Sequence, residues 1–239
     1  MLLKTEDLVK IYNHRRVVNG VGFEVKEGEI VGLLGRNGAG KTTTFKMTIG
    51  MIKPTEGKVW LKDKEITYLP MYKRARAGMG YLAQEPSVFR DLSVEDNLLA
   101  IIEIFSKDKP KNIEKANDLL TEYGLIKLAN QKAKTLSGGE MRRLEICRSL
   151  ITSPSIILLD EPFSGVDPIA VSEIQEFLRK LKSKNIGILL TDHNVRETLA
   201  VTDRSYIIDE GIILCSGTPM EIMHNPLARA RYLGEKFTL

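Results

Sequence analysis

The 239-residue sequence has few cysteines, no long apolar run and no tract of one charge sign. Only Cys147 and Cys215 occur, and neither belongs to a Cys-x-x-Cys pair. A disulfide framework and a cysteine-based zinc site are therefore not expected. No apolar stretch approaches the roughly 20 residues that cross a bilayer, so any membrane role is expected to be peripheral. The N-terminus lacks the basic-then-apolar build of a secretory signal. The scarcity of cysteine fits a reducing cytoplasm.

The charge balance gives little support to a nucleic-acid partner. The net charge is only +4, and lysine and arginine are dispersed along the chain. Nucleic-acid binding is therefore not expected. We find no internal repeat or low-complexity segment, and the content of 43% hydrophobic and 28% charged residues is typical of a globular protein.

The most informative stretch runs from Gly35 to Thr42 and has the sequence Gly-Arg-Asn-Gly-Ala-Gly-Lys-Thr. It follows the apolar run Ile30–Leu34 and precedes a helix-compatible segment, which is the context of a P-loop. Glycines let successive N–H groups point at phosphate oxygens, and the helix N-terminus adds partial positive charge. The pattern predicts nucleoside triphosphate binding by Gly35, Arg36, Asn37, Gly38, Ala39, Gly40, Lys41, Thr42 and Thr43. Lys41 is expected to bridge the β- and γ-phosphates, and the Thr42 hydroxyl to ligate Mg²⁺.

A second apolar run, Ile156–Leu159, ends in Asp160 and Glu161. Adjacent strand residues point to opposite sides, so the two acids need not share one task. Asp160 is positioned to reach the magnesium shell, directly or through water. Glu161 is positioned to accept a hydrogen bond from the attacking water and to act as general base. The alternative is a strand that simply ends in charges at the solvent.

The segment Leu136–Glu140, Leu-Ser-Gly-Gly-Glu, precedes a helix with one apolar face. A serine hydroxyl and two glycine N–H groups at a helix N-terminus form a second anion site. One chain then has one P-loop but two phosphate-binding surfaces. Two chains meeting head to tail explain this, with Ser137, Gly138 and Gly139 of each covering the nucleotide of the other.

In this order, the motifs resemble those of ATP-binding-cassette (ABC) ATPases, the nucleotide-binding subunits of transporters, over nearly the whole chain. The segment 136–140 resembles their signature, Gln84 their Q-loop and Ser164–Asp167 their D-loop. His193 resembles their switch histidine, and Tyr12 the aromatic residue that stacks on adenine. Kinases and switch GTPases lack a Leu-Ser-Gly-Gly-Glu loop and are excluded.

The resemblance implies ATP and Mg²⁺ as cofactors and a homodimer that closes on two ATP molecules. It implies that Gln84 touches Mg²⁺, that His193 contacts the γ-phosphate with Glu161, and that Asp167 links the two sites. Each of these residues has an alternative interpretation when it is considered without the others. Gln84 would be a surface glutamine, His193 a satisfied loop histidine and Tyr12 a core aromatic.

Strands alternating with helices predict an α/β fold with a mainly parallel sheet, and the resemblance makes it a P-loop NTPase fold with a RecA-like core. The N-terminal pieces predict a small antiparallel sheet, with turns at Asn19-Gly20 and Glu27–Glu29. Further on, Gly80–Gln84 is expected as a strand and Lys107–Lys111 as a loop. We expect one domain over 1–239, with a core of residues 1–89 and 154–239 and a helical lobe of residues 90–153.

Several longer stretches resemble the ATPase subunits of lipopolysaccharide exporters of diderm bacteria. These stretches are Gly35–Thr44, Arg74–Arg76, Gly78–Leu82, Phe89–Val94, Asp160–Pro168, Thr191–Ala200 and Tyr232–Leu239. Arg36 and Ala83 replace a usual proline, and Met141 a usual arginine or glutamine, without removing a catalytic group. ATPases of branched-chain amino-acid importers are the nearest alternative. ABC proteins of DNA repair or the ribosome are a second, but they carry two cassettes, long coiled-coil insertions or zinc-binding cysteines.

The subfamily resemblance also implies partners. Two integral-membrane permeases would insert coupling helices into a groove formed by the Q-loop and residues 84–105, at the cytoplasmic face of the inner membrane. Phe89, Arg90 and Leu92 are the candidate contacts, with a core position in the helical lobe as the alternative for Phe89. On the apolar helix face, Cys147 is expected to be a buried structural thiol.

Overall fold

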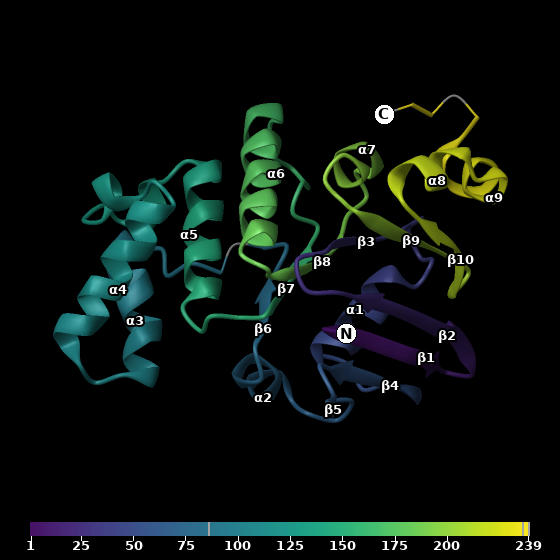
Figure 1. Ribbon diagram of the computed structural model, residues 1–239, viewed down its shortest axis with the longest axis horizontal. Helices are drawn as coiled ribbons and strands as arrows, with labels where there is room; N and C mark the ends of the chain where they lie inside the picture. The colour runs from purple at the N-terminus through teal and green to yellow at the C-terminus, as the bar shows by residue number, and fades with distance from the viewer. Residues whose placement is uncertain (86, 236, 239) are drawn as a thin grey trace.

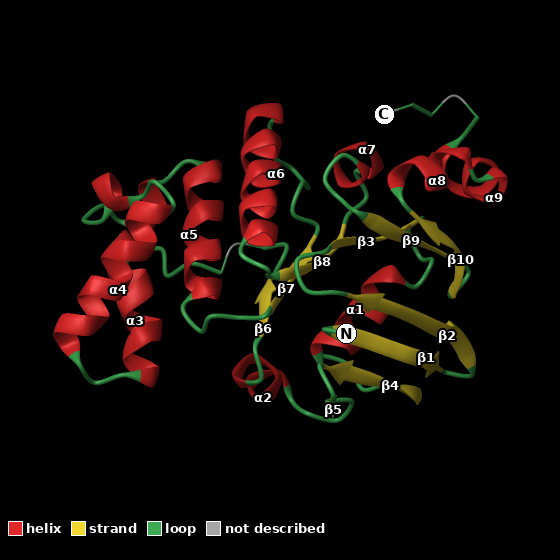
Figure 2. Ribbon diagram, viewed as in Figure 1, coloured by secondary structure: helices red, strands yellow, loops and turns green. Residues whose placement is uncertain are grey.

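The computed structural model describes residues 1–85, 87–235 and 237–238 of the chain. Two sheets organise these residues (Figure 2). The smaller sheet has the strand order β2-β1-β4-β5 and the larger has β10-β9-β3-β8-β7-β6. The strands of the smaller sheet are β1 (Leu3–Tyr12), β2 (Arg15–Val25), β4 (Glu56–Leu61) and β5 (Lys64–Glu65). Those of the larger are β3 (Ile30–Gly35), β6 (Met79–Leu82), β7 (Ile156–Asp160), β8 (Gly187–Thr191), β9 (Arg204–Asp209) and β10 (Ile212–Gly217).

The larger sheet is parallel except at one edge. Strand β3 pairs in parallel with β8 and β9, and β7 pairs in parallel with β6 and β8. Strand β10 runs antiparallel to β9. All residues of β3, β7 and β8 are buried, as expected for parallel strands covered on both faces. The predicted α/β fold with a parallel core is confirmed, although β6 ends at Leu82, two residues before Gln84.

Most helices lie around this sheet, and three form a separate group to one side of it (Figure 1). That group consists of α3 (Val94–Phe105), α4 (Lys109–Glu122) and α5 (Gly138–Leu150), joined by the short helices η1 (Ile126–Leu128) and η2 (Ala133–Thr135). The other helices are α1 (Lys41–Ile49), α2 (Met71–Arg76), α6 (Pro168–Ser183), α7 (Val195–Leu199), α8 (Pro219–His224), α9 (Pro226–Ala228) and the π-helical η3 (Arg229–Leu233). None of the helices in the described ranges combines the length and hydropathy that crossing a bilayer requires.

The predicted antiparallel sheet is confirmed, but the turn predicted at Asn19-Gly20 is wrong. Strand β2 continues through both residues, and Asn19 pairs with Val9 while Val21 pairs with Leu8. Gly20, at φ 73°, is the extra residue at this register shift. An Asn-Gly pair supplies positive φ for a bulge as readily as for a hairpin turn.

The loop predicted at Lys107–Lys111 is also partly wrong, because α4 begins at Lys109. The Asp108 side chain accepts a hydrogen bond from the Lys111 N–H, which caps the helix. Pro110 stands in the first turn, where its missing N–H costs nothing. The proline therefore marks a helix start here rather than a loop.

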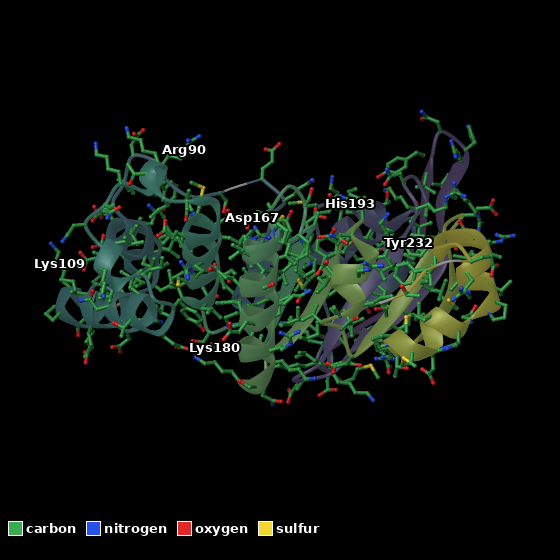
Figure 3. The ribbon with its side chains drawn as sticks, turned by 90° about the horizontal axis from the view of Figure 1, so that it is seen from above. Arg90, Lys109, Asp167, Lys180, His193 and Tyr232 are labelled. Carbon is green, nitrogen blue, oxygen red and sulfur yellow. The ribbon has the colours of Figure 1, made fainter. Side chains whose placement is uncertain are left out.

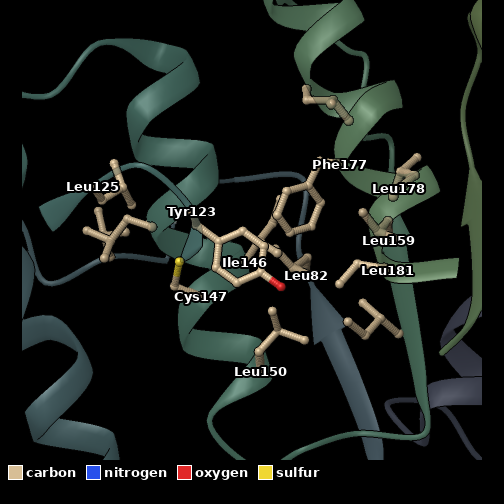
Figure 4. Packing of buried hydrophobic residues seen from close by; sticks show 14 of the residues in the cluster. Leu82, Tyr123, Leu125, Ile146, Cys147, Leu150, Leu159, Phe177, Leu178 and Leu181 are labelled. Carbon is tan, nitrogen blue, oxygen red and sulfur yellow. The ribbon is translucent and has the colours of Figure 1, made fainter. Parts of the chain in front are cut away.

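The helical group and the sheet share one apolar core (Figure 4). The rings of Tyr123 in the α4 C-cap and Phe177 in α6 lie 5.0 Å apart between centroids. Cys147 of α5 is fully buried beside them, and burial raises the pKa of its thiol to about 12. The expectation of a buried structural thiol is confirmed.

A buried arginine fixes the end of the helix that follows the P-loop. Arg74 of α2 is 1% exposed, and its guanidinium donates to the carbonyl oxygens of Met47, Thr48 and Thr67. The first two carbonyls belong to the last turn of α1, where the helix supplies no N–H four residues further on, and Met47 O also accepts from the N–H of the C-cap residue Gly50. The helix that carries Lys41 is thereby held at its far end.

Candidate functional site

Glycine is required at two positions of the P-loop. Strand β3 ends at Gly35, where φ is 150° and a Cβ would lie 2.1 Å from the carbonyl oxygen of Ile208 in β9. At Gly40, φ is 103° and a Cβ would lie 2.8 Å from the carbonyl oxygen of Val17. Any larger residue would push the loop away from the strands beneath it.

The loop leaves the start of α1 available to an anion. Helix α1 begins at Lys41, no side chain caps it, and no acidic residue stands in its first turn. Thr42 is exposed and Thr43 half-exposed at this end. The first N–H groups of a helix carry partial positive charge, which suits phosphate oxygens.

Lys41 places a fixed charge beside the same loop. Its side chain is buried, and Nζ donates to the carbonyl oxygens of Gly35, at 2.5 Å, and Arg36, at 3.0 Å. Burial lowers the pKa of the ammonium group, while the nearby carboxylates of Glu161 and Asp192 oppose this shift. Carbonyl oxygens satisfy its N–H donors without neutralising its charge, so the site retains a cation for a phosphate.

Three predicted residues meet at the ends of neighbouring strands. Gln84 follows β6, Glu161 follows β7 and His193 follows β8. Gln84 Nε2 donates to Glu161 Oε2 at 2.9 Å, and His193 Nδ1 lies 3.3 Å from the same oxygen. The backbone at Glu161 has φ 48°, and its N–H donates to Thr191 O at 2.7 Å. An exposed histidine and an amide thus converge on one carboxylate, which can accept a proton from a water molecule.

Asp160 occupies a different environment from Glu161. It is the last residue of β7 and is buried. Burial raises the pKa of its carboxyl, the neighbouring Glu161 adds to this, and Lys46 opposes it. The predicted magnesium ligands Thr42, Asp160 and Gln84 all offer oxygen atoms, as Mg²⁺ prefers. In the part of the chain described, no three His, Cys, Asp or Glu residues cluster as a metal cage. The donor set fits Mg²⁺ completed by phosphate and water.

Sequence reasoning missed the role of Asp192. Its side chain is fully buried, and it accepts hydrogen bonds from the backbone N–H groups of Phe163 and Asn194, both at 2.8 Å. Burial nevertheless raises the pKa of its carboxyl. These bonds tie the loop after Glu161 to the loop that carries His193. The motif around His193 was visible in the sequence, but nothing in it marked this carboxylate as the connecting residue.

The signature segment is a capped helix start that lies apart from the P-loop. Ser137 is the N-cap of α5, and its hydroxyl and N–H both donate to Glu140 Oε2, at 2.7 and 2.8 Å. These bonds lower the pKa of the Glu140 carboxyl. Across the described ranges, no hydrogen bond joins residues 136–140 to residues 35–43. Figure 1 shows α5 in the helical group and α1 beside the sheets, so the chain does not bring Ser137, Gly138 and Gly139 to its own P-loop.

Two further predicted residues lie at the ends of elements. Tyr12 ends β1 and is 43% exposed, so the reading as a core aromatic is wrong. Asp167 is the N-cap of α6, where Oδ1 accepts from the N–H groups of Ile169 and Ala170. In Figure 3, His193 lies on the side of Asp167 away from Arg90, which lies in the loop before α3.

The candidate partner contacts are at the surface. Phe89 is 47% exposed and Leu92 39%, and Arg90 is also exposed. The alternative of a core position for Phe89 is therefore wrong. Asn97 of α3 fixes this loop by bonding both the N–H and the carbonyl oxygen of Phe89.

Comparison with known proteins decides the family. The sequence model described as "ABC transporter" matches residues 18–164. The chain belongs to the ABC transporter family of ATP-binding proteins. It is thus an ATPase coupled to transport, and the predicted family, activity and ATP binding are confirmed.

Individual relatives match this cassette over nearly its whole length. It is 50% identical to a lipopolysaccharide export system ATP-binding protein LptB of Acidithiobacillus ferridurans, covering 100% of this chain and 99% of the relative. It is 48% identical to LptB of Escherichia coli, covering 99% of both. An uncharacterized ABC transporter ATP-binding protein of Rhizobium meliloti is 52% identical, with 97% of this chain and 86% of the relative covered.

A solved structure supports the fold assignment. The crystal structure of an ATP-binding cassette of an ABC transporter in its ADP conformation is 31% identical and superposes with a TM-score of 0.88. The match covers 98% of this chain and 99% of that one. The predicted ABC ATPase fold, with its antiparallel subdomain, is confirmed.

We expect Asp160→Asn to change how the stability of the cassette without nucleotide and metal depends on pH. The pKa of Asp160 is raised above its ordinary value of 3.8. The folded chain therefore binds this proton more tightly, and the group stabilises the folded state less as pH rises from the ordinary to the raised pKa. The free energy of unfolding of Asp160→Asn minus that of the wild type should therefore increase as pH rises through this window. Urea unfolding between pH 3 and 7 measures it, with the exposed Asp63→Asn as baseline. A decrease of this difference with rising pH would contradict the argument that burial raises the pKa of Asp160.

Proposed function

We propose that this cassette powers the extraction and export of lipopolysaccharide from the inner membrane. The observation that carries this proposal is the match to two proteins named LptB, at 50% and 48% identity over 99% or more of both partners in each pair. The stretches 191–200 and 232–239 also resemble that subfamily, although Lys236 and Leu239 lie outside the described residues. Amino-acid import uses the same ATPase chemistry, so an experiment must distinguish it from lipopolysaccharide export.

The proposed reaction is in-line attack of water on the γ-phosphorus of ATP. Glu161 Oε2 accepts one proton of the water, whose oxygen bonds to phosphorus while the bond to the bridging β–γ oxygen breaks. His193, already 3.3 Å from that carboxylate oxygen, would hold the water and γ-phosphate in line. Lys41 and the N–H groups of the P-loop stabilise the phosphate charge. Mg²⁺, held through Thr42, Asp160 and Gln84, would neutralise charge on the phosphates.

The proposed working unit is a head-to-tail homodimer. The separation of the signature segment from the P-loop of the same chain supports this, because a second copy can place Ser137, Gly138 and Gly139 on the nucleotide. The surface beside the D-loop supports it as well, since Ile169 is 75% exposed next to Asp167. Tyr12, exposed at the end of β1, would stack on the adenine ring.

The proposed division of the chain follows these tasks. Residues 1–89 and 154–239 would form the nucleotide-binding core, and residues 90–153 the helical lobe that carries the signature. Two permeases would dock near the Q-loop and this lobe, against Phe89, Arg90 and Leu92. The cassette would then lie on the cytoplasmic face of the inner membrane without crossing it.

Affinity purification of the tagged cassette from native membranes in mild detergent tests the export proposal. We expect two related permeases with periplasmic domains and a single-span partner to co-purify, as mass spectrometry would show. Amino-acid permeases in their place would establish the import alternative. Ribosomal or repair proteins without a permease would overturn the transport assignment.

We expect Glu161→Gln to slow ATP hydrolysis by about 10²–10⁴-fold, because the amide cannot accept the proton of the attacking water. ATP binding should persist, since Lys41 and the P-loop are unchanged, and an ATP-bound dimer should accumulate. Phosphate release and size-exclusion chromatography with light scattering measure both effects. The exposed Glu114→Gln, in α4, serves as control. Hydrolysis by Glu161→Gln at the wild-type rate would exclude Glu161 as the base.

We expect Phe89→Ala to uncouple transport from hydrolysis while the affinity for ATP stays within about twofold of wild type. The reason is that Phe89 is exposed and belongs to the loop before α3, away from the P-loop. Permease recovery in the purification above and ATP binding of the isolated cassette are the two measurements. Ile104→Ala, at an exposed site later in α3, is the matched control. A weaker affinity for ATP with full permease recovery would refute the docking role.

A further inference from the structure

One face of α5 holds the main chain of the Q-loop. Arg142 Nη1 donates to the carbonyl oxygen of Ala83 at 3.1 Å. Glu145 Oε1 accepts from the N–H of Ser87 at 2.6 Å, and Arg148 Nη1 donates to Ser87 O at 2.5 Å. The three α5 residues are spaced three apart and therefore share one side of the helix. They bind the chain on both sides of Gln84.

The centre of this contact is a buried ion pair. Arg142 Nη1 lies 2.9 Å from Glu145 Oε2, and the two side chains are 10% and 4% exposed. Nε and Nη2 of Arg142 have no hydrogen-bond partner within the described residues. A buried pair with unsatisfied donors is a poor source of stability, although removing one partner is costly. A role in holding the Q-loop main chain in place explains the ion pair better than a contribution to stability does.

The side chain of Gln84 points away from α5 and contacts the end of a neighbouring strand. It reaches Glu161 at the end of β7, at 2.9 Å, while the main chain around it is bound to α5. Helix α5 starts at the signature residue Ser137. One short segment therefore connects the signature helix, through its backbone, to the proposed catalytic base, through its side chain.

We infer that Glu145 is a positioning residue that makes the Q-loop backbone move together with the signature helix. Through the clamp of Arg142, Glu145 and Arg148, a displacement of α5 carries Gln84 with it and changes its contact with Glu161. The inference rests on the proposed roles of Glu161 and Gln84 in hydrolysis. It adds that the segment moving together with the helical lobe begins at Ala83 rather than at residue 90. Release of the clamp should then impair the chemical step and leave nucleotide binding intact.

The test compares Glu145→Ala, Glu145→Gln and the control Glu122→Ala, which removes ion pairs that join the same lobe to Lys180 and Lys184 of the core. Backbone hydrogen exchange of residues 83–85 and 87–89 and steady-state ATP hydrolysis are measured on the full-length protein, together with thermal unfolding. Glu145→Ala should accelerate exchange there about tenfold, because the Ser87 N–H loses its acceptor. It should lower kcat about tenfold and leave KM for ATP within about twofold. Glu145→Gln keeps an acceptor and should retain exchange and kcat within about threefold. Glu122→Ala should change neither quantity.

Wild-type exchange and kcat in Glu145→Ala would overturn the inference, as would a rise in KM that accounts for the loss of activity. If Glu145→Ala does not fold, Arg148→Met carries the test, because it removes the bond to Ser87 O. The same rise in exchange and fall in kcat are expected, and their absence counts against the clamp. If the wild type hydrolyses no ATP, the proposed function fails. The exchange data alone then decide whether α5 holds the loop.

Discussion

The pairing of β6, β7 and β8 is the constraint on which the site depends. Leu82 of β6 pairs with Leu159 of β7, and Asp160 pairs with Thr191 of β8. Because the strands are parallel, their carboxyl ends share one edge, and the residues that follow them meet there. A shift of one residue in this register would turn the buried side chains to the other face of the sheet. The contact of Glu161 with Gln84 and His193 is thus a consequence of packing in the sheet interior.

The protein itself compensates the charge at this edge only in part. Burial lowers the pKa of Lys41 and raises those of Asp160 and Asp192, so each charged form is disfavoured by its surroundings. Lys41 bonds to neutral carbonyl oxygens, not to a carboxylate. A phosphate group beside Lys41 and a cation beside Asp160 would supply the missing counter-charges. The stability given up here is what one expects where a protein binds a charged ligand.

The sequence allowed the local parts of this site to be predicted, and the distant connections only by resemblance. A P-loop is contiguous, so its glycines, lysine and flanking strand and helix are visible in 20 residues. The capping bond between Ser137 and Glu140 is also local, yet no pattern in the sequence assigns Glu140 a separate role. Asp192 was missed because its partner, the N–H of Phe163, is 29 residues away. The Asn19-Gly20 bulge was misread because the same dipeptide suits a turn, and only pairing with β1 distinguishes the two.

The capped signature segment bears on how a dimer would open and close. In the single chain, the Ser137 hydroxyl donates to Glu140, and the low pKa of that carboxyl means that the acceptor is a carboxylate near neutral pH. A phosphate reaching this helix end from a second copy must compete for that hydroxyl and approach a negative charge. Closure would then exchange an intrachain bond for an interchain one, and the net gain is smaller than the count of new contacts suggests. A small net gain lets the loss of one phosphate reverse the association, and a cyclic machine requires this reversibility.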